Sequence, residues 1–294
     1  MAERYNTTPA EFWNSFYNNN QSKFFKDRHW LRIEFAELFE WTTDRKSADV
    51  GDVSTGADRA DAPLAAHTKC SASLEMPGGA VSEAGMSTAV QSGLPTASDA
   101  RFRIMEVGCG AGNAVFPLLA DVMDPRLFVY ACDYSKVAVD VVKASAEYNQ
   151  HRCAAFVWDL SSTELPPDVE PGSIDIMLMI FVFSALHPSQ WAQAVENAYR
   201  LLKPGGLLLF RDYGRNDLAQ LRFKKSRLLE ENLYIRGDGT RVYFFTNDEL
   251  AEIFGAKFAI EQNAIDRRLL VNRKRELKMY RVWLQAKFRK PISA

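Results

Sequence analysis

An apolar run that enters a glycine-rich turn is the feature that most constrains the fold of this chain. The run occupies residues 103–107, and Gly108, Gly110 and Gly112 follow it in a Gly-x-Gly-x-Gly spacing. Glycines in such a turn let the backbone pass close to a nucleotide-like ligand, because a Cβ atom would collide with it. The segment therefore predicts a strand followed by a ligand-binding turn.

The glycine spacing distinguishes between two kinds of nucleotide. A dinucleotide-binding fingerprint is Gly-x-Gly-x-x-Gly, whose third glycine lies one position later than Gly112. The shorter spacing, with the acidic Glu106 two residues before Gly108, favours S-adenosylmethionine. We expect Glu106, Gly108 and Gly110 to contact that cofactor. A glycine-rich turn that only closes a loop is the alternative.

Two further acidic residues stand where predicted strands end. Asp133 follows the strand predicted at 127–132, and a carboxylate there can accept hydrogen bonds from both ribose hydroxyls. Asp159 follows the strand predicted at 155–158, and it can accept from the adenine amino group while Leu160 packs near the ring. The alternative for a single acidic residue at a strand end is a helix cap.

The order of these elements is more specific than any one of them. An apolar strand is predicted at 174–180, and a helix-breaking segment at 201–206 precedes a further apolar strand at 207–210. With the glycine turn and the strand-end acids, this succession resembles the Class I S-adenosylmethionine-dependent methyltransferases. The resemblance implies an α/β, Rossmann-like fold, with a mainly parallel sheet and helices on both faces.

Composition bears on the size of the core and on the compartment. The chain has 294 residues, of which 47% are hydrophobic, so it can bury one large core plus an appendage. No Cys-x-x-Cys spacing occurs, which favours buried, reduced thiols over a disulfide or a metal site for Cys70, Cys109, Cys132 and Cys153. No apolar stretch is long enough to cross a bilayer, and the first residues resemble neither a signal nor a transit peptide. We expect a cytoplasmic protein with no membrane partner.

Aromatic content divides the chain into three regions. Residues 1–41 are rich in aromatic residues and are expected to form a helical segment, whereas residues 42–100 contain no Phe, Trp or Tyr. The second composition cannot bury enough apolar surface to offset the ordering entropy, so we predict a disordered insertion. The methyltransferase domain is expected at 101–294, and its part at 211–294 has 19 Lys or Arg against 11 Asp or Glu. This local excess predicts a basic RNA-binding appendage, with a merely solvated surface as the alternative.

Five longer segments resemble the family of tRNA 3-methylcytidine methyltransferases. They are FFKDRHW at 24–30, IFVFSALHP at 180–188, RDYGR at 211–215, RGDGTRVYFF at 236–245 and DRRLLVNR at 266–273. The low-complexity insertion favours the threonine and arginine tRNA branch of that family over the serine branch. The resemblance implies an enzyme that forms 3-methylcytidine at position 32 of the anticodon loop. The expected partner is tRNA, and an aminoacyl-tRNA synthetase is a candidate for delivering it.

The family resemblance also assigns residues to the cofactor. Trp13 and Tyr17 are four residues apart, on one helical face, and are expected to close over the cofactor as a lid. A core-packing stripe is the alternative for this pair. The chain departs from the family pattern at 256–265, which is shorter and more irregular than expected. The other contacts that the resemblance implies are Gly108, Asp133, Asp159, Leu160 and Ile180.

Methylation of cytosine N3 needs little acid–base assistance. The N3 atom keeps a free lone pair at neutral pH, so the enzyme must mainly align the base and stabilise the cationic product. Asp212 follows the strand predicted at 207–210, at the edge where α/β sheets bind substrates. We hypothesise that Asp212 accepts from the cytosine amino group. The alternative is that it pairs with Arg211 or Arg215.

Basic residues supply the candidate RNA contacts. Lys26, Arg28 and His29 either bind phosphates near the reacting base or form a packing motif that fixes the lid. His187 is expected to be structural. The further candidates are Arg211, Arg215, Lys224, Lys225, Arg236, Arg241, Arg268 and Arg273.

Two other classes of function remain open at the level of the sequence. One is a methyltransferase that acts on a protein or a small molecule, for which a basic RNA-binding face is unnecessary. The other is a methyltransferase-like subunit that binds RNA or a partner without turnover. The presence of Glu106, Asp133 and Asp159 argues against loss of the cofactor, and the glycine spacing argues against a dehydrogenase.

Overall fold

The computed structural model describes residues 2–41, 100–272 and 276–292. The predicted disordered insertion lies outside these ranges except for its last residue, and so do Cys70 and the RNA-contact candidate Arg273. Within the described ranges, no helix is long and apolar enough to span a membrane.

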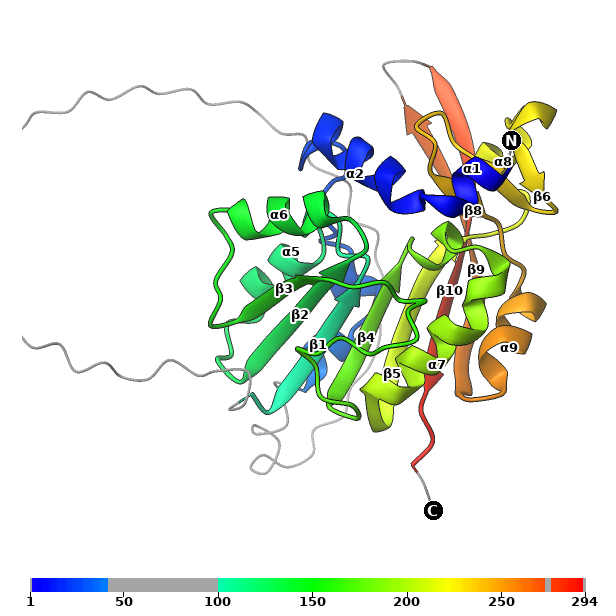
Figure 1. Ribbon diagram of the computed structural model, residues 1–294. Helices are drawn as coiled ribbons and strands as arrows, with labels where there is room; N and C mark the ends of the chain where they lie inside the picture. Colours follow the sequence, from blue (N-terminus) through cyan, green and yellow to red (C-terminus); the bar gives the residue numbers. More distant parts are fainter. Residues whose placement is uncertain (1, 42–99, 273–275, 293–294) are drawn as a thin grey trace, which may run out of the picture. The chain divides into compact units, whose positions relative to one another are not determined.

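A seven-stranded sheet forms the centre of the structure (Figure 1). In spatial order its strands are β3 (Cys153–Val157), β2 (Leu127–Asp133), β1 (Phe102–Val107), β4 (Ile174–Ile180), β5 (Leu202–Tyr213), β10 (Leu277–Arg289) and β9 (Ala259–Asn272). Strand β10 pairs antiparallel with β5 and β9, whereas all other neighbours in this sheet are parallel. The prediction of a mainly parallel α/β sheet is confirmed.

Helices cover both faces of the sheet (Figure 1). One face carries α3 (Leu31–Glu34), α4 (Glu37–Glu40), α5 (Val115–Asp121) and α6 (Lys136–Ala144), and the other carries α7 (Trp191–Leu201) and α9 (Asn247–Gly255). The alternation of side chains along β1 explains the two layers, because Ile104 is buried in the first and Met105 in the second. The prediction of helices on both faces is therefore confirmed.

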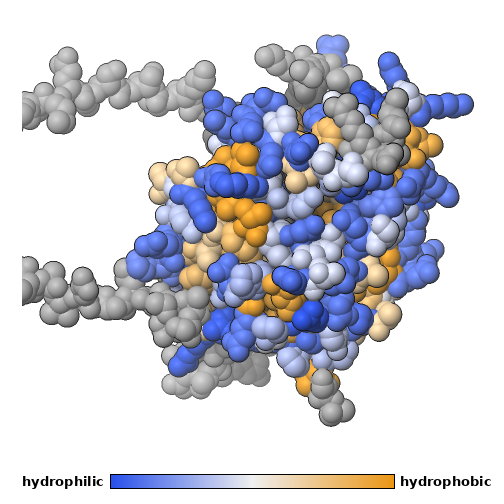
Figure 2. Space-filling model, viewed as in Figure 1, coloured by the Kyte–Doolittle hydropathy of each residue, from blue (hydrophilic) through white to orange (hydrophobic). Residues whose placement is uncertain are grey.

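Most of the large hydrophobic side chains are buried in these two layers. Charged and polar side chains cover most of the face shown in Figure 2, where hydrophobic ones form separate patches. The interior also holds Cys109, Cys132 and Cys153, which are free. Burial raises the pKa of each of these thiols, which keeps them protonated. Buried, reduced thiols are what the sequence predicts for them.

Smaller elements surround the carboxyl ends of the parallel strands. They are α1 (Ala2–Thr7), α2 (Pro9–Asn20), the single-turn helices Phe183–Ala185, Pro188–Gln190 and Lys225–Arg227, α8 (Leu218–Leu221), and a three-stranded antiparallel sheet of β6 (Leu228–Glu230), β7 (Leu233–Ile235) and β8 (Arg241–Tyr243). The long segment between β5 and α9 is therefore an insertion at the edge of the sheet where ligands of α/β proteins bind.

The hairpin of β9 and β10 extends past the rest of the sheet. Residues 283–289 of β10 pair with β5, whereas residues 277–282 pair only with β9. Helix α9 ends at Gly255 and β9 begins at Ala259, so residues 256–265 form a short connection and the start of β9. The pairing of β9 with β10 shifts register there, between Ile260 and Gln262.

Candidate functional site

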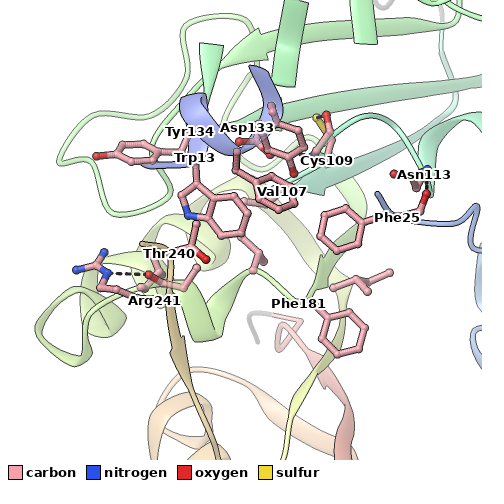
Figure 3. A pocket seen from close by; sticks show the side chains of 18 of the residues that line it. Trp13, Phe25, Val107, Cys109, Asn113, Asp133, Tyr134, Phe181, Thr240 and Arg241 are labelled. Atoms are coloured by element: carbon pink, nitrogen blue, oxygen red, sulfur yellow. Dashed lines mark hydrogen bonds between the residues drawn. The ribbon is translucent and has the colours of Figure 1, made fainter. Parts of the chain in front are cut away.

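A pocket of 470 Å³ opens at the carboxyl ends of β1, β2 and β4 (Figure 3). Its volume lies in the range typical of small-molecule sites. All but one of the predicted cofactor contacts line it, namely Trp13, Tyr17, Gly108, Gly110, Asp133, Asp159, Leu160 and Ile180. The exception is Glu106, which lies beneath the glycine turn and is only 1% exposed.

The glycine turn is shaped by its protein neighbours as well as by the pocket. Gly108 and Gly110 have φ angles of +67° and +55°, which residues with side chains rarely adopt. A Cβ atom at Gly110 would lie 2.6 Å from the hydroxyl oxygen of Tyr17, and one at Gly108 would lie 2.5 Å from Cγ2 of Val182. The turn therefore needs glycine to admit α2 and the loop after β4, which the sequence alone does not indicate.

Asp133 ties the glycine turn to the end of β2. Its Oδ2 accepts a hydrogen bond from the Gly110 N–H at 2.9 Å, and its Oδ1 accepts one from the Ser135 N–H at 2.8 Å. The helix-cap alternative is wrong for Asp133, because Ser135 caps α6 by accepting from the Ala138 N–H. Burial raises the pKa of Asp133 to about 6, so the carboxylate is mostly ionised at pH 7 and can accept further bonds.

Asp159 and Leu160 line the pocket beyond β3. The Oδ1 atom of Asp159 accepts from the N–H of Ser161 at 2.8 Å and from its hydroxyl at 2.7 Å, which stabilises a tight turn. Since the described chain contains no helix between β3 and β4, the helix-cap alternative is also wrong here. The buried Leu160 follows directly and offers an apolar surface to a planar ring.

Glu106 joins the glycine turn to the segment 24–30. Its Oε1 accepts from Nη1 of Arg28 at 3.2 Å, and its buried Oε2 has no hydrogen-bond partner in the part of the chain that the structure describes. The Arg28 N–H donates to the carbonyl oxygen of Asn113 at 2.7 Å, and the Asn113 side chain donates to Asp27 at 3.0 Å. These contacts support the packing alternative for Arg28.

The titration of Glu106 gives a prediction for stability. Burial raises its pKa from 4.5 to about 7, although the Arg28 guanidinium opposes this. The folded protein thus binds the proton more tightly than the unfolded chain, and its stability falls as pH rises from 4.5 to about 7. We expect Glu106→Gln to remove a slope of up to about 1.4 kcal/mol per pH unit from the unfolding free energy. Urea unfolding of both proteins at several pH values measures this, and parallel pH profiles would contradict it.

Helix α2 brings Trp13 (Figure 3) and Tyr17 to the pocket. Their rings stack with centroids 6.1 Å apart, and Asn14 anchors the helix by accepting from the Ser135 hydroxyl at 2.7 Å. Tyr17 is also buried against Ala138 of α6. The stripe on α2 is therefore a packing face and a pocket wall at once, while its movement as a lid stays a prediction.

Asp212 is not among the residues that line the pocket. It is fully buried, and its carboxylate accepts from the backbone N–H groups of Ser184 and Tyr213, each at 2.9 Å. The alternative of pairing with Arg211 or Arg215 is wrong, because those guanidinium groups pair with other carboxylates. Burial raises the pKa of Asp212 to about 6. These contacts support a role in holding the loop after β4, and direct contact with the base stays a prediction.

Three of the predicted RNA contacts are engaged inside the protein. Arg211 is 3% exposed and pairs with Asp266, so the prediction that it contacts RNA is wrong. Arg215 is half-buried and holds both oxygens of Glu249. Arg241 is buried, donates to neighbouring oxygens and lines the pocket, so it faces the ligand site and not the outer surface.

The other basic candidates retain some exposure. Arg236 is half-buried and lines the pocket, as does the exposed Lys26. His187 has the structural role that was expected, because its ring accepts from the Ser189 N–H at 3.3 Å in a short capped turn. The exposed members of the set are Lys26, His29, Lys224, Lys225 and Arg268, the last of which pairs with Glu34 and Asp266.

The sequence did not reveal an aromatic and basic wall of the pocket. Phe181, Tyr213 and Trp283 follow or belong to different strands, yet the pairing of β10 with β5 sets Trp283 opposite Tyr213. The guanidinium group of Arg281 lies 5.9 Å from the Tyr213 ring and 5.4 Å from the Trp283 ring. The sequence carries one signal of this wall, the grouping of Tyr280, Arg281 and Trp283 in a short segment.

Comparison with known proteins agrees with this geometry. Residues 105–208 match a family model described as a methyltransferase domain. Among solved structures, a SAM-dependent methyltransferase from Methanosarcina mazei superposes with a TM-score of 0.51 and 20% identity, over 65% of this chain and 93% of that one. This similarity bears on the fold alone, and it confirms the methyltransferase-type α/β architecture.

Curated relatives are similar over almost the whole chain. The tRNA N(3)-methylcytidine methyltransferase trm140 of Schizosaccharomyces pombe is 45% identical over 98% of this chain and 76% of its own length. The human tRNA N(3)-cytidine methyltransferase METTL2B is 45% identical, over 98% of this chain and 80% of its own. A tRNA(Thr) (cytosine(32)-N(3))-methyltransferase of Saccharomyces cerevisiae is 46% identical over 98% of this chain and 38% of its own length.

Proposed function

We propose, since this chain belongs to the tRNA N(3)-cytidine methyltransferase family, that it methylates N3 of a cytidine in tRNA with S-adenosylmethionine as the methyl donor. The observation that carries this proposal is 45% identity over 98% of the chain to a relative named for that activity. The two alternatives left open by the sequence, another substrate class and a subunit without turnover, have no support among these relatives.

The pocket fits the methyl donor by its own chemistry. Gly108 and Gly110 line the pocket without side chains, so a ligand can approach the backbone of the turn closely. The carboxylates of Asp133 and Asp159 suit ribose hydroxyls and an adenine amino group, and Leu160 suits the adenine ring. We therefore assign these residues to the cofactor.

The reaction requires alignment of the cytosine base with the methyl donor more than it requires acid–base catalysis. When bound, S-adenosylmethionine supplies a methyl group whose bond to sulfur breaks, with the electron pair left on sulfur, as the cytosine N3 lone pair forms the new bond. No proton leaves the base, and the methylated ring carries the positive charge. The chain has to hold the base in line, and such alignment can lower a barrier by about 7–11 kcal/mol.

The finer assignment is position 32 of the anticodon loop, in threonine tRNA or arginine tRNA. The name of the Saccharomyces cerevisiae relative and the position of the insertion at 42–100 support it. Within this proposal, residues 1–41 are a cofactor lid and tRNA-binding segment, and 211–294 supply RNA-binding elements. The buried free thiols are compatible with the cytoplasm, and an aminoacyl-tRNA synthetase remains the candidate partner.

The test is direct methylation of defined tRNAs. The purified chain is incubated with S-adenosylmethionine and separate threonine, arginine and serine tRNAs, and methylated nucleosides are quantified by mass spectrometry. We expect 3-methylcytidine in threonine or arginine tRNA, and none when cytidine 32 is replaced by uridine. Product that persists in the uridine 32 tRNA would overturn the position, and a different methylated nucleoside would overturn the reaction.

Lys26 is the exposed basic residue at the pocket for which we predict a phosphate contact. It forms no ion pair with any residue that the structure describes, in contrast to its neighbour Arg28. We expect Lys26→Ala to lower the slope of log affinity against log salt for tRNA by about 0.7–0.9, which is the effect of one phosphate contact. Lys143→Ala is the matched control, because Lys143 lies in the last turn of α6, away from the pocket. Equal slopes for the wild type and Lys26→Ala would refute the contact.

A further inference from the structure

Phe181 has a backbone conformation that its own side chain disfavours. It is the first residue after β4, and its φ is +58°, in the left-handed region that bulky residues rarely adopt. Its N–H donates to the Arg211 carbonyl oxygen at 2.7 Å, and the nearby side chains of Ile180 and Phe183 are buried. The surroundings therefore force the conformation on Phe181, and such residues cluster at ligand-binding sites.

The ring of Phe181 belongs to the aromatic wall of the pocket. Its centroid lies 4.9 Å from that of Tyr213 and 6.1 Å from that of Trp283. Guanidinium groups already lie over both of those rings, that of Arg236 over Tyr213 and that of Arg211 over Trp283. Within the described residues no cationic side chain lies over the ring of Phe181. Of the three rings, it is the one whose π-system remains for a ligand.

The position of Phe181 suits the second substrate. The next residue, Val182, abuts the glycine turn, because a Cβ at Gly108 would approach it to 2.5 Å. Phe181 therefore adjoins the part of the pocket assigned to the cofactor, and its ring lies toward the aromatic wall. Figure 3 shows Phe181 and Phe25 on one side of the pocket, with Trp13 across from them. A base stacked on Phe181 would thus lie across the pocket from Trp13.

Resting on the proposed function, we propose that Phe181 is the residue on which the target cytosine stacks, and that its ring favours the cationic methylated base over a neutral one. An aromatic face attracts a cation and holds a neutral base less strongly. Since positive charge develops on the cytosine ring as the methyl group arrives, this contact is stronger in the transition state than in the ground state. Phe181 therefore contributes to kcat more than to KM.

Three substitutions separate stacking from a purely structural role. We expect Phe181→Leu, which retains apolar bulk, to lower kcat about tenfold or more, with KM for tRNA changed less than kcat. Phe181→Tyr should retain most of the activity because it retains the ring. Phe181→Gly relieves the backbone strain but also removes the ring, so it should lower kcat like the leucine variant. A leucine variant within twofold of wild-type kcat would overturn the proposal, as would a glycine variant with wild-type turnover.

Binding of free nucleosides tests the preference for charge independently of turnover. The probes are 3-methylcytidine, which is cationic at pH 7, and its neutral analogue 3-methyluridine, added to protein saturated with S-adenosylhomocysteine. We expect wild type to bind the cation at least about fivefold more tightly, as cation–π attraction of this strength implies, and Phe181→Leu to lose the difference. Equal binding of the two nucleosides by wild type would overturn the proposal. Failure of the proposed function would look different, since wild type would then form no 3-methylcytidine in any tRNA.

Discussion

Replacing Gly110 with alanine is expected to weaken S-adenosylmethionine binding by one to two orders of magnitude. The residue has a φ of +55°, which costs an alanine on the order of 1–2 kcal/mol. Its new Cβ would also lie 2.6 Å from the hydroxyl oxygen of Tyr17, so α2 would have to shift. Both changes disturb the Gly110 N–H bond to Asp133, which orients the carboxylate assigned to the ribose. Isothermal titration with S-adenosylmethionine measures the loss.

Gly172→Ala is the matched control for the free-energy cost of placing alanine at a positive φ. Gly172 has a φ of +67°, yet no atom lies within 4 Å of the position that a Cβ would take. We expect this variant to lose stability by the same 1–2 kcal/mol or so and to bind S-adenosylmethionine as wild type does. A double variant, Gly110→Ala with Tyr17→Phe, removes the closest atom and should recover part of the affinity. Equal affinities for the Gly110→Ala and Gly172→Ala variants would contradict the collision with α2.

The cofactor half of the pocket was predictable because its signals are local in sequence. Gly108 follows β1 directly, Asp133 is the last residue of β2 and Asp159 comes two residues after β3. Parallel strands bring these carboxyl ends to one edge of the sheet. The order of the strands then follows from the fold that the succession resembles. Local sequence could not show that the Tyr17 hydroxyl occupies the space beside Gly110. Helix α2 and the glycine turn are far apart in the sequence, with the whole insertion at 42–100 between them.

The part of the pocket that faces the substrate was harder to predict from the sequence, because a count of charged residues does not distinguish a paired guanidinium group from an exposed one. Arg211 and Asp212 are neighbours on β5, yet alternation sends their side chains to opposite faces of the sheet. Arg211 therefore meets the hairpin residues Gln285 and Asp266, while Asp212 meets the backbone of Ser184. The partners of Arg211 depend on the register in which β10 pairs with β5, and the sequence did not predict that register.

The position of Arg211 makes it the strongest candidate for a residue on which stability depends. Its guanidinium group lies 4.9 Å from the ring centroids of both Trp30 and Trp283. It pairs with Asp266 of the hairpin and lies 3.7 Å from Glu34 of α3. One buried cation thus joins the central sheet, the hairpin and the N-terminal segment. Removing it leaves two carboxylates without their buried partner.

We therefore expect Arg211→Met to lower the free energy of unfolding by about 3 kcal/mol, the lower end of the range for a broken buried ion pair. The lower end applies because Glu34 and Asp266 keep side-chain exposures of 18% and 22% and retain Arg268 as a partner. Methionine preserves the apolar contact with the two indole rings, so the loss reports on charge. Equilibrium urea unfolding measures it.

Arg268→Ala is the matched control, because Arg268 pairs with the same two carboxylates from an exposed position. Its side chain is 43% exposed, and surface ion pairs contribute about 0–1 kcal/mol. The difference between the two variants therefore isolates the effect of burial at Arg211. If both variants lost the same small free energy of unfolding, burial would add nothing to the ion pairs of Arg211. A large loss for Arg211→Met alone would show that its buried ion pairs join the hairpin to the N-terminal segment. Trp283 of the aromatic wall belongs to that hairpin, so the wall of the pocket would then depend on a residue that does not line the pocket.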